Sequence, residues 1–249
     1  MQTIDLEKYV AELQLGRPAS AYPQRREVTP LLAENQEQSF LNDKSVVSFA
    51  SEVNGQRRKD VLNSVLLAQL AANKQFSDDT QILDWYRAFI KVLNNLGWMI
   101  QEAEFSTFEA KADVFEVQNA IIEILTKAFG GTFQSVIMST LDSIKALGDE
   151  DGKITAFEKN THSLSKGAFQ IALATEANET VALQLGTFML NSSNEIKKIL
   201  FFKSSKDRTR LDYCSRQGTL NEEIYAIARQ SVSDKLGDKI DHFVAEIEL

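Results

Sequence analysis

The prolines of this chain are confined to one short stretch, and this distribution constrains the fold more than any other feature of the sequence. Pro18, Pro23 and Pro30 are the three prolines, so residues 31–249 contain none. Because proline removes a backbone donor and interrupts helices and central strands, the chain after residue 30 is free to form long regular elements. We expect residues 1–45 to form an N-terminal helix and a proline-bearing, removable arm, and residues 46–249 to form a single globular domain.

Amphipathic helical patterns fill the first half of that domain. Residues 79–97 place apolar side chains at the i, i+3, i+4, i+7, i+8, i+11 spacing of one helical face. Apolar faces of the same kind predict a helical body over residues 57–166. Val46–Val53 fits a strand or a helix, and residues 98–112 fit a short strand or a loop. The individual helices are expected at residues 57–74, 79–97, 113–129 and 132–147.

A two-residue period replaces the helical one after Gly167. Phe169, Ile171 and Leu173 alternate with smaller or polar residues, as residues 181–185 do, which is the pattern of strands. A third strand is expected at Lys198–Lys203 and a fourth at Arg208–Ser215. The sequence therefore predicts an α+β fold: a predominantly helical body, and in residues 167–249 a small antiparallel β-meander (about residues 168–215) followed by a C-terminal helix. We expect one face of the meander to pack on the helices, and the last helix to begin at the capping box Thr219–Glu222 and to continue its period to Ile247.

Charge and composition exclude several classes of function. The net charge of −8 and the sequence pI near 5.0 oppose binding to nucleic acid. The two histidines and one cysteine form no zinc motif, and no glycine-rich nucleotide motif or nucleophile elbow is present. We expect no cofactor and no nucleic-acid partner, and we expect the chain not to be an enzyme.

Cys214 is the candidate nucleophile if the chain is an unrecognised hydrolase or transferase. Arg216 lies two residues away, and a nearby positive charge lowers the pKa of a thiol. No sequence spacing brings His162 or His242 to this cysteine as a general base. Because single cysteines are mostly small buried hydrophobes, we keep a catalytic or modified Cys214 as the weaker alternative.

An acidic turn near the middle of the chain carries the candidate metal ligands Asp149, Asp151 and Glu158. With Gly152 aligned to the invariant glycine, these residues resemble positions 3, 5 and 12 of the EF-hand calcium loop. The resemblance covers about a dozen residues, and Leu147 stands at the first ligand position without a ligating oxygen. The alternative that we favour is a helix start, with Thr155–Glu158 as a capping box.

Six basic residues form the candidate binding patch for an anion, a lipid head group or an acidic partner. Phe201 and Phe202 lie within it. The alternative is that these lysines protect the edge of an apolar strand, which is the interpretation that we favour. The residues are Lys197, Lys198, Lys203, Lys206, Arg208 and Arg210.

The aromatic pair Trp85–Tyr86, together with Trp98, fits a pocket between helices or, as we favour, the apolar core. The start MQTIDLEKYV shows no secretory signal, and the uncharged runs 128–141 and 180–194 are too short and too polar for a spanning helix. We therefore expect a cytoplasmic protein, or one exported by a signal-independent route. The leading hypothesis is a non-enzymatic protein that binds another protein or its own copies. The alternative is a toxin-like effector that contacts membranes through residues 128–141 and 169–190 without being integral to them.

Overall fold

The framework of the molecule is an eight-stranded mixed sheet. The computed structural model describes residues 5–23, 35–77, 81–102, 104–148 and 151–249. Within the sheet β2 and β6 run parallel and the other neighbours run antiparallel. In spatial order the strands are β10 (Val244–Ile247), β1 (Gln38–Asn42), β2 (Ser45–Phe49), β6 (Lys166–Ala177), β7 (Thr180–Ser192), β9 (Thr209–Leu220) and β3 (Trp98–Ile100), with β4 (Ser106–Thr107) also paired to β9.

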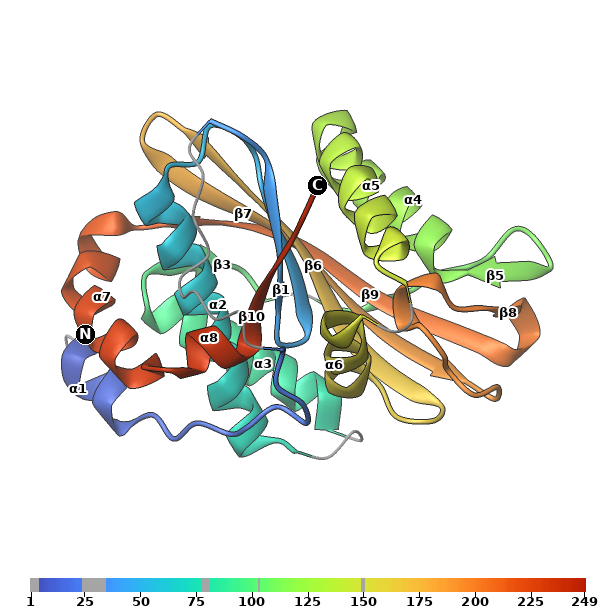
Figure 1. Ribbon diagram of the computed structural model, residues 1–249, viewed down its shortest axis with the longest axis horizontal. Coiled ribbons are helices and arrows are strands. Elements are labelled where there is room, and N and C mark those ends of the chain that lie inside the picture. The colour runs from blue at the N-terminus through green and yellow to red at the C-terminus, as the bar shows by residue number, and fades with distance from the viewer. Residues whose placement is uncertain (1–4, 24–34, 78–80, 103, 149–150) are drawn as a thin grey trace.

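Helices cover both faces of this sheet (Figure 1). The first layer contains α1 (Leu6–Glu12), α2 (Gly55–Gln75), α3 (Ile82–Asn95), α7 (Glu222–Leu236) and α8 (Lys239–Phe243). The second layer contains α4 (Val117–Phe129), α5 (Gly131–Ala146) and α6 (Gly152–Thr161). Beyond the main sheet, β5 (Val114–Glu116) and β8 (Lys203–Ser205) form a two-stranded ribbon. The helices α2 to α5 correspond to those predicted from the apolar periodicity.

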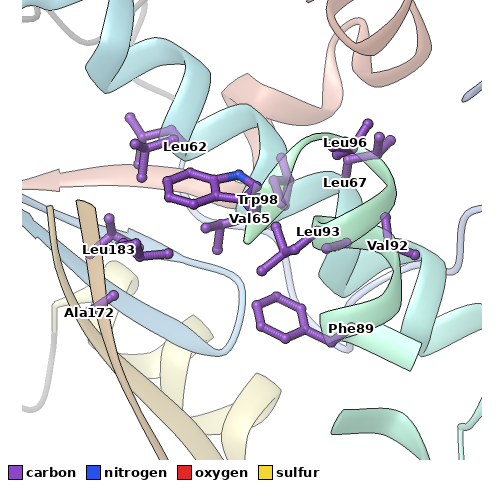
Figure 2. Close-up of a cluster of buried hydrophobic side chains, with 14 of the residues drawn as sticks. Leu62, Val65, Leu67, Phe89, Val92, Leu93, Leu96, Trp98, Ala172 and Leu183 are labelled. Carbon is purple, nitrogen blue, oxygen red and sulfur yellow. The ribbon is translucent and has the colours of Figure 1, made fainter. Parts of the chain in front are cut away.

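Two apolar cores fill the space between the sheet and the two helical layers. Figure 2 shows the first, in which Trp98, Phe89 and Leu93 pack toward Ala172 and Leu183 of the sheet. On β6, alanines face this first core, whereas Ile171 and Leu173 face the second. Both faces of the sheet are therefore buried under helices, whereas we expected this of one face. Ala172 and Ala174 of β6 lie in the same core as residues of α2 and α3.

The fold is α+β as predicted, but the sheet is much larger than a small meander beside a predominantly helical body. The third strand predicted at Lys198–Lys203 is wrong, since Ile199–Phe201 forms a short 3₁₀ helix, η2. Its apolar residues are buried in the second core, so their burial rather than strand pairing explains the apolar run. The third strand of the meander is β9, which runs well past the predicted fourth strand.

The C-terminal segment differs from the predicted continuous helix. Thr219 and Leu220 end β9, and the side chain of Asn221 caps α7 by accepting a hydrogen bond from the Ile224 amide at 3.1 Å. After α8 the chain becomes extended, and β10 pairs antiparallel with β1. The open edge of β1 supplies backbone partners, and this tertiary pairing overrides the helical spacing of the apolar residues.

The boundary predicted at residue 45 falls inside a hairpin. Strands β1 and β2 are joined by the two-residue turn Asp43–Lys44, and Asp43 adopts a left-handed conformation with φ 50°. All five residues of β1 are buried. Earlier in the chain, Val10 and Tyr22 are also buried. Residues 38–45 therefore belong to the sheet and not to an arm, while Pro30 lies outside the described residues.

Candidate functional site

The six basic residues proposed as a binding patch lie around β8 and the start of β9. Lys198 adopts a left-handed conformation with φ 58°, and Arg208 lines a shallow polar depression. The carboxylates near the other four reduce the positive charge that the patch presents. Whether it binds an anion stays a prediction. The ion pairs are Lys197–Glu195, Lys203–Glu116, Lys206–Asp113 and Arg210–Asp212, with N–O distances from 2.8 to 3.4 Å.

The candidate calcium ligands that are described lie at different ends of α6. Asp151 is the N-cap of this helix, since its Oδ1 accepts from the Lys153 amide at 2.7 Å, and the cap predicted at Thr155 is therefore placed one turn too late. Glu158 accepts from the Ile199 amide at 2.8 Å. Asp149 lies outside the described residues. Within the described ranges no group of three or more His, Cys, Asp or Glu side chains is placed to hold a metal ion.

Cys214 is buried in β9, where its sulfur lies 3.2 Å from the Tyr86 hydroxyl. Burial raises the pKa of this thiol, although the Tyr86 hydrogen bond and the Arg216 charge oppose the shift. Arg216 thus acts in the predicted direction, but burial outweighs it. Because the thiolate is the nucleophilic form, the environment of Cys214 does not activate it.

A cavity of about 360 Å³ lies between the first helical layer and the end of α6. In Figure 1, α3 and α6 both lie toward the lower edge of the view. This volume falls in the range of about 300–1,000 Å³ that is typical of small-molecule sites. Its walls come from six parts of the chain: residues 17–19, Lys44 of the β1–β2 turn, the end of α2 with residues 76–77, the start of α3, residues 159–163 at the end of α6, and residues 166–170 and 187 of the sheet.

Two polar side chains of the sheet lie in the cavity wall with unused hydrogen-bonding groups. Gln170 and Thr187 are register partners on β6 and β7, and they are 1% and 2% exposed. Gln170 Oε1 accepts from Ser45 Oγ at 2.7 Å, but Gln170 Nε2 and Thr187 Oγ1 have no partner within the described part of the chain. Each unsatisfied group costs about 1–3 kcal/mol, so such atoms are rare in native proteins and need an explanation.

Four basic side chains line the same cavity. They are Arg17, Lys44, Lys159 and Lys166, and none of them lies within ion-pairing distance of a carboxylate among the described residues. No acidic residue of the described segments lines the cavity. In a chain with a net charge of −8, this wall is therefore locally positive.

His162 also lines the cavity, but both of its ring nitrogens already have partners. Nε2 lies 2.7 Å from Glu158 Oε2, and Nδ1 lies 2.9 Å from the Ser163 carbonyl oxygen. Burial is the largest single influence and lowers the pKa of His162, but the Glu158 and Ser163 contacts together raise it above its ordinary value. The ring therefore forms a wall of the cavity that its contacts with Glu158 and Ser163 hold in place.

Trp85 and Tyr86, the aromatic wall of the cavity, are the part of this site that the sequence indicated. Trp85 and Tyr86 line the cavity and also belong to the first core, whereas Trp98 lies in that core and donates to Ser64 Oγ at 3.0 Å. The cations gave no signal because they come from separate segments. Gln170 and Thr187 are polar residues inside uncharged segments of β6 and β7, and this feature could have indicated the part of the cavity wall that the sheet forms.

No family model matches the sequence, and no curated protein matches it. Several solved structures are similar to this one, among them the following three. A delta-endotoxin shares 14% identity with a TM-score of 0.42, over 80% of this chain and 89% of that chain. The activated Cyt2Ba monomer from Bacillus thuringiensis subsp. israelensis shares 12% identity with a TM-score of 0.32, over 54% of this chain and 79% of that chain. The Evf virulence factor shares 10% identity with a TM-score of 0.38, over 94% of this chain and 89% of that chain. Similarity at this level does not place the chain in a family. Among its described helices, none has the length and apolar character needed to cross a membrane.

Proposed function

We propose that this protein is a non-enzymatic binding protein that takes a small organic molecule into the cavity between α3 and α6. The observation that carries this proposal is the Gln170–Thr187 pair in the cavity wall. These buried groups have no partner among the residues that the structure describes, and a bound molecule would supply one. The wall also combines aromatic side chains with a few polar groups, as ligand sites do.

Binding is favoured over catalysis because the residues near the cavity are not activated. Tyr86 lines the cavity and contacts Cys214, whose thiol has a raised pKa. The ring nitrogens of His162 are occupied by Glu158 and Ser163, so this histidine has no free nitrogen with which to act as a base. A protein partner or self-association stays a prediction beside this site.

We expect the uncharged dye N-phenyl-1-naphthylamine to bind the wild-type protein with micromolar affinity. Ala168 is half-buried on β6 and lines the cavity, so the substitution Ala168→Phe would fill part of it. Loss of cavity volume should weaken dye binding by about tenfold or more, which corresponds to about 1.4 kcal/mol. Dye fluorescence titrations of the two proteins measure the difference.

The matched control is Ala128→Phe, which adds the same ring to an exposed position of α4 outside the cavity. Its dye affinity should equal that of the wild type. Both variants are first checked for a cooperative thermal transition, and Ala19→Trp at the exposed rim of the cavity replaces Ala168→Phe if that variant does not fold. Equal dye affinity in the cavity-filling and control variants, or no dye binding by the wild type, would contradict the proposal.

A second candidate function is a membrane-active effector, and the β6–β7 hairpin favours it. Residues 167–175 and 180–194 contain no charged side chain, and the two strands are 12 and 13 residues long. Both faces of this hairpin are covered by helices, so contact with lipid would require a helical layer to separate from the sheet. The corner between α4 and α5 at Gly130, with φ 89°, is a place where one layer could hinge.

For this second function we expect micromolar protein to release an entrapped dye from vesicles that contain phosphatidylglycerol, at neutral or acidic pH. Zwitterionic phosphatidylcholine vesicles, which have no net charge, are the control. They should release less dye because the basic residues of β8 and β9 would attract anionic lipid. An intact anionic vesicle at both pH values would exclude this function and would leave the cavity proposal unaffected.

A further inference from the structure

We propose that the molecule bound in the cavity is an amphipathic organic anion, with an apolar body against the aromatic wall and a carboxylate, sulfonate or phosphate group among the cavity cations. This inference rests on the proposed function, because it names the chemical class of that ligand. It depends on three features of the wall: its charge, its apolar surface and the buried polar pair.

The charge of the wall selects for an anion. Lys44 and Lys166 are half-buried, whereas Arg17 and Lys159 are exposed. A partly desolvated cation interacts more strongly with an opposite charge than a fully hydrated one does. Neither half-buried lysine forms an ion pair with a carboxylate of the described residues, although the charge of Lys44 also acts on the buried Asp43 carboxyl group. Direct contact with either ammonium group is therefore open to a ligand.

The apolar surface of the wall is held rigidly in place. Trp85 Nε1 donates to Asn73 Oδ1 at 2.7 Å, and its ring stacks on Phe89 at 5.5 Å with an interplanar angle of 6°. Lys44 Nζ lies 5.4 Å from the centroid of the same ring. A flat apolar ligand that packs on this wall would therefore place its charged group close to Lys44. A preorganised wall of this kind loses little side-chain entropy when a ligand binds.

The polar pair adjoins that lysine. The backbone N–H of Gln170 donates to the backbone carbonyl oxygen of Lys44 at 3.0 Å, so the two residues are neighbours across the β2–β6 junction. Gln170 Nε2 is a donor and the Thr187 hydroxyl can donate, which suits the acceptor oxygens of an acidic group. The positive charge of the cavity wall and the donors of Gln170 and Thr187 thus both favour an anionic ligand.

The experiment compares two dyes that share their rings and differ in one charged group. The anion is 8-anilinonaphthalene-1-sulfonate, and the uncharged analogue is N-phenyl-1-naphthylamine. We expect the sulfonate to bind the wild-type protein at least about tenfold more tightly, as a hydrogen-bonded charge contact would give. The double variant Lys44→Met/Lys166→Met should lose about tenfold in affinity for the sulfonate and keep its affinity for the uncharged dye.

The matched control is Lys127→Met/Lys145→Met, which changes the net charge equally at exposed residues of α4 and α5 outside the cavity. It should bind both dyes as the wild type does. Retained binding of the uncharged dye also shows that the cavity of the Lys44/Lys166 variant is intact. Equal affinity of the wild type for the two dyes, or equal losses in both double variants, would overturn the anion inference while the proposed function stands. Failure of both dyes to bind would overturn both.

Discussion

Deletion of residues 1–45 is expected to abolish cooperative unfolding, although the prolines in this segment suggest a removable arm. The deletion removes β1, whose two neighbours β10 and β2 would lose their pairing with it. It also removes two partners of the fully buried Arg58, which donates to Gln38 Oε1 at 2.6 Å and to the Gln36 carbonyl oxygen at 2.7 Å. Leaving a buried charge short of partners costs several kcal/mol, a large fraction of the stability of a typical domain.

The control is a chain that begins at residue 38 and so keeps the β1–β2 hairpin. It loses α1 and Tyr22, whose hydroxyl donates to the Asp43 carbonyl oxygen at 2.8 Å. We expect this shorter deletion to unfold cooperatively at a lower temperature, as followed by near-ultraviolet circular dichroism. The same transition midpoint for both deletions would show that β1 is not part of the cooperative unit.

The substitution Asp43→Asn is expected to increase the free energy of unfolding by up to ~3 kcal/mol at neutral and alkaline pH. Asp43 is fully buried, and burial raises the pKa of its carboxyl group from 3.8 to about 6, against the opposing effects of Lys44 and the Asn73 hydrogen bond. Its Oδ2 accepts from Asn73 Nδ2 at 2.9 Å, while Oδ1 has no partner among the described residues. Asparagine keeps the accepting oxygen and tolerates the left-handed turn.

The sign of this effect follows from the raised pKa of Asp43. Between its unfolded value of 3.8 and about 6 the unfolded chain releases the proton while the folded chain keeps it, so stability falls as pH rises through this window. The gain from Asp43→Asn should therefore be small below about pH 4 and complete above about pH 6, as measured by urea unfolding across this range. The control Asp113→Asn changes a side chain that is 94% exposed and should have little effect. A gain independent of pH would contradict ionisation as the cause.

Sequence patterns identified the longer elements that show a helical or two-residue period and missed short strands that show neither. Helix α3 has one apolar face, and its periodicity is visible in the sequence alone. Strand β1 is five residues long and buried throughout, so it shows neither period. The pairing of β10 with β1 depends on a partner about 200 residues away, which no local pattern reports.

The candidate site was predictable only in part, for a related reason. Trp85 and Tyr86 stand out as adjacent aromatics, but their role in a cavity depends on residues from other elements. Gln170 fits a solvent-facing position if one face of the sheet is open, and it becomes unusual only when that face is covered. The cations of the cavity come from four places in the chain and converge only through the fold.

The parallel pairing of β2 with β6 has a consequence for the order in which the chain folds. Ser45 and Gln170 meet at this seam across a separation of 125 residues, whereas the β1–β2 and β6–β7 hairpins form from close neighbours. Contacts between distant residues carry a larger loop-closure cost and slow folding. We therefore expect the two halves of the sheet to assemble separately and to join late. A molecule that hydrogen-bonds to Gln170 would hold these halves together, so its departure would loosen the contact between them.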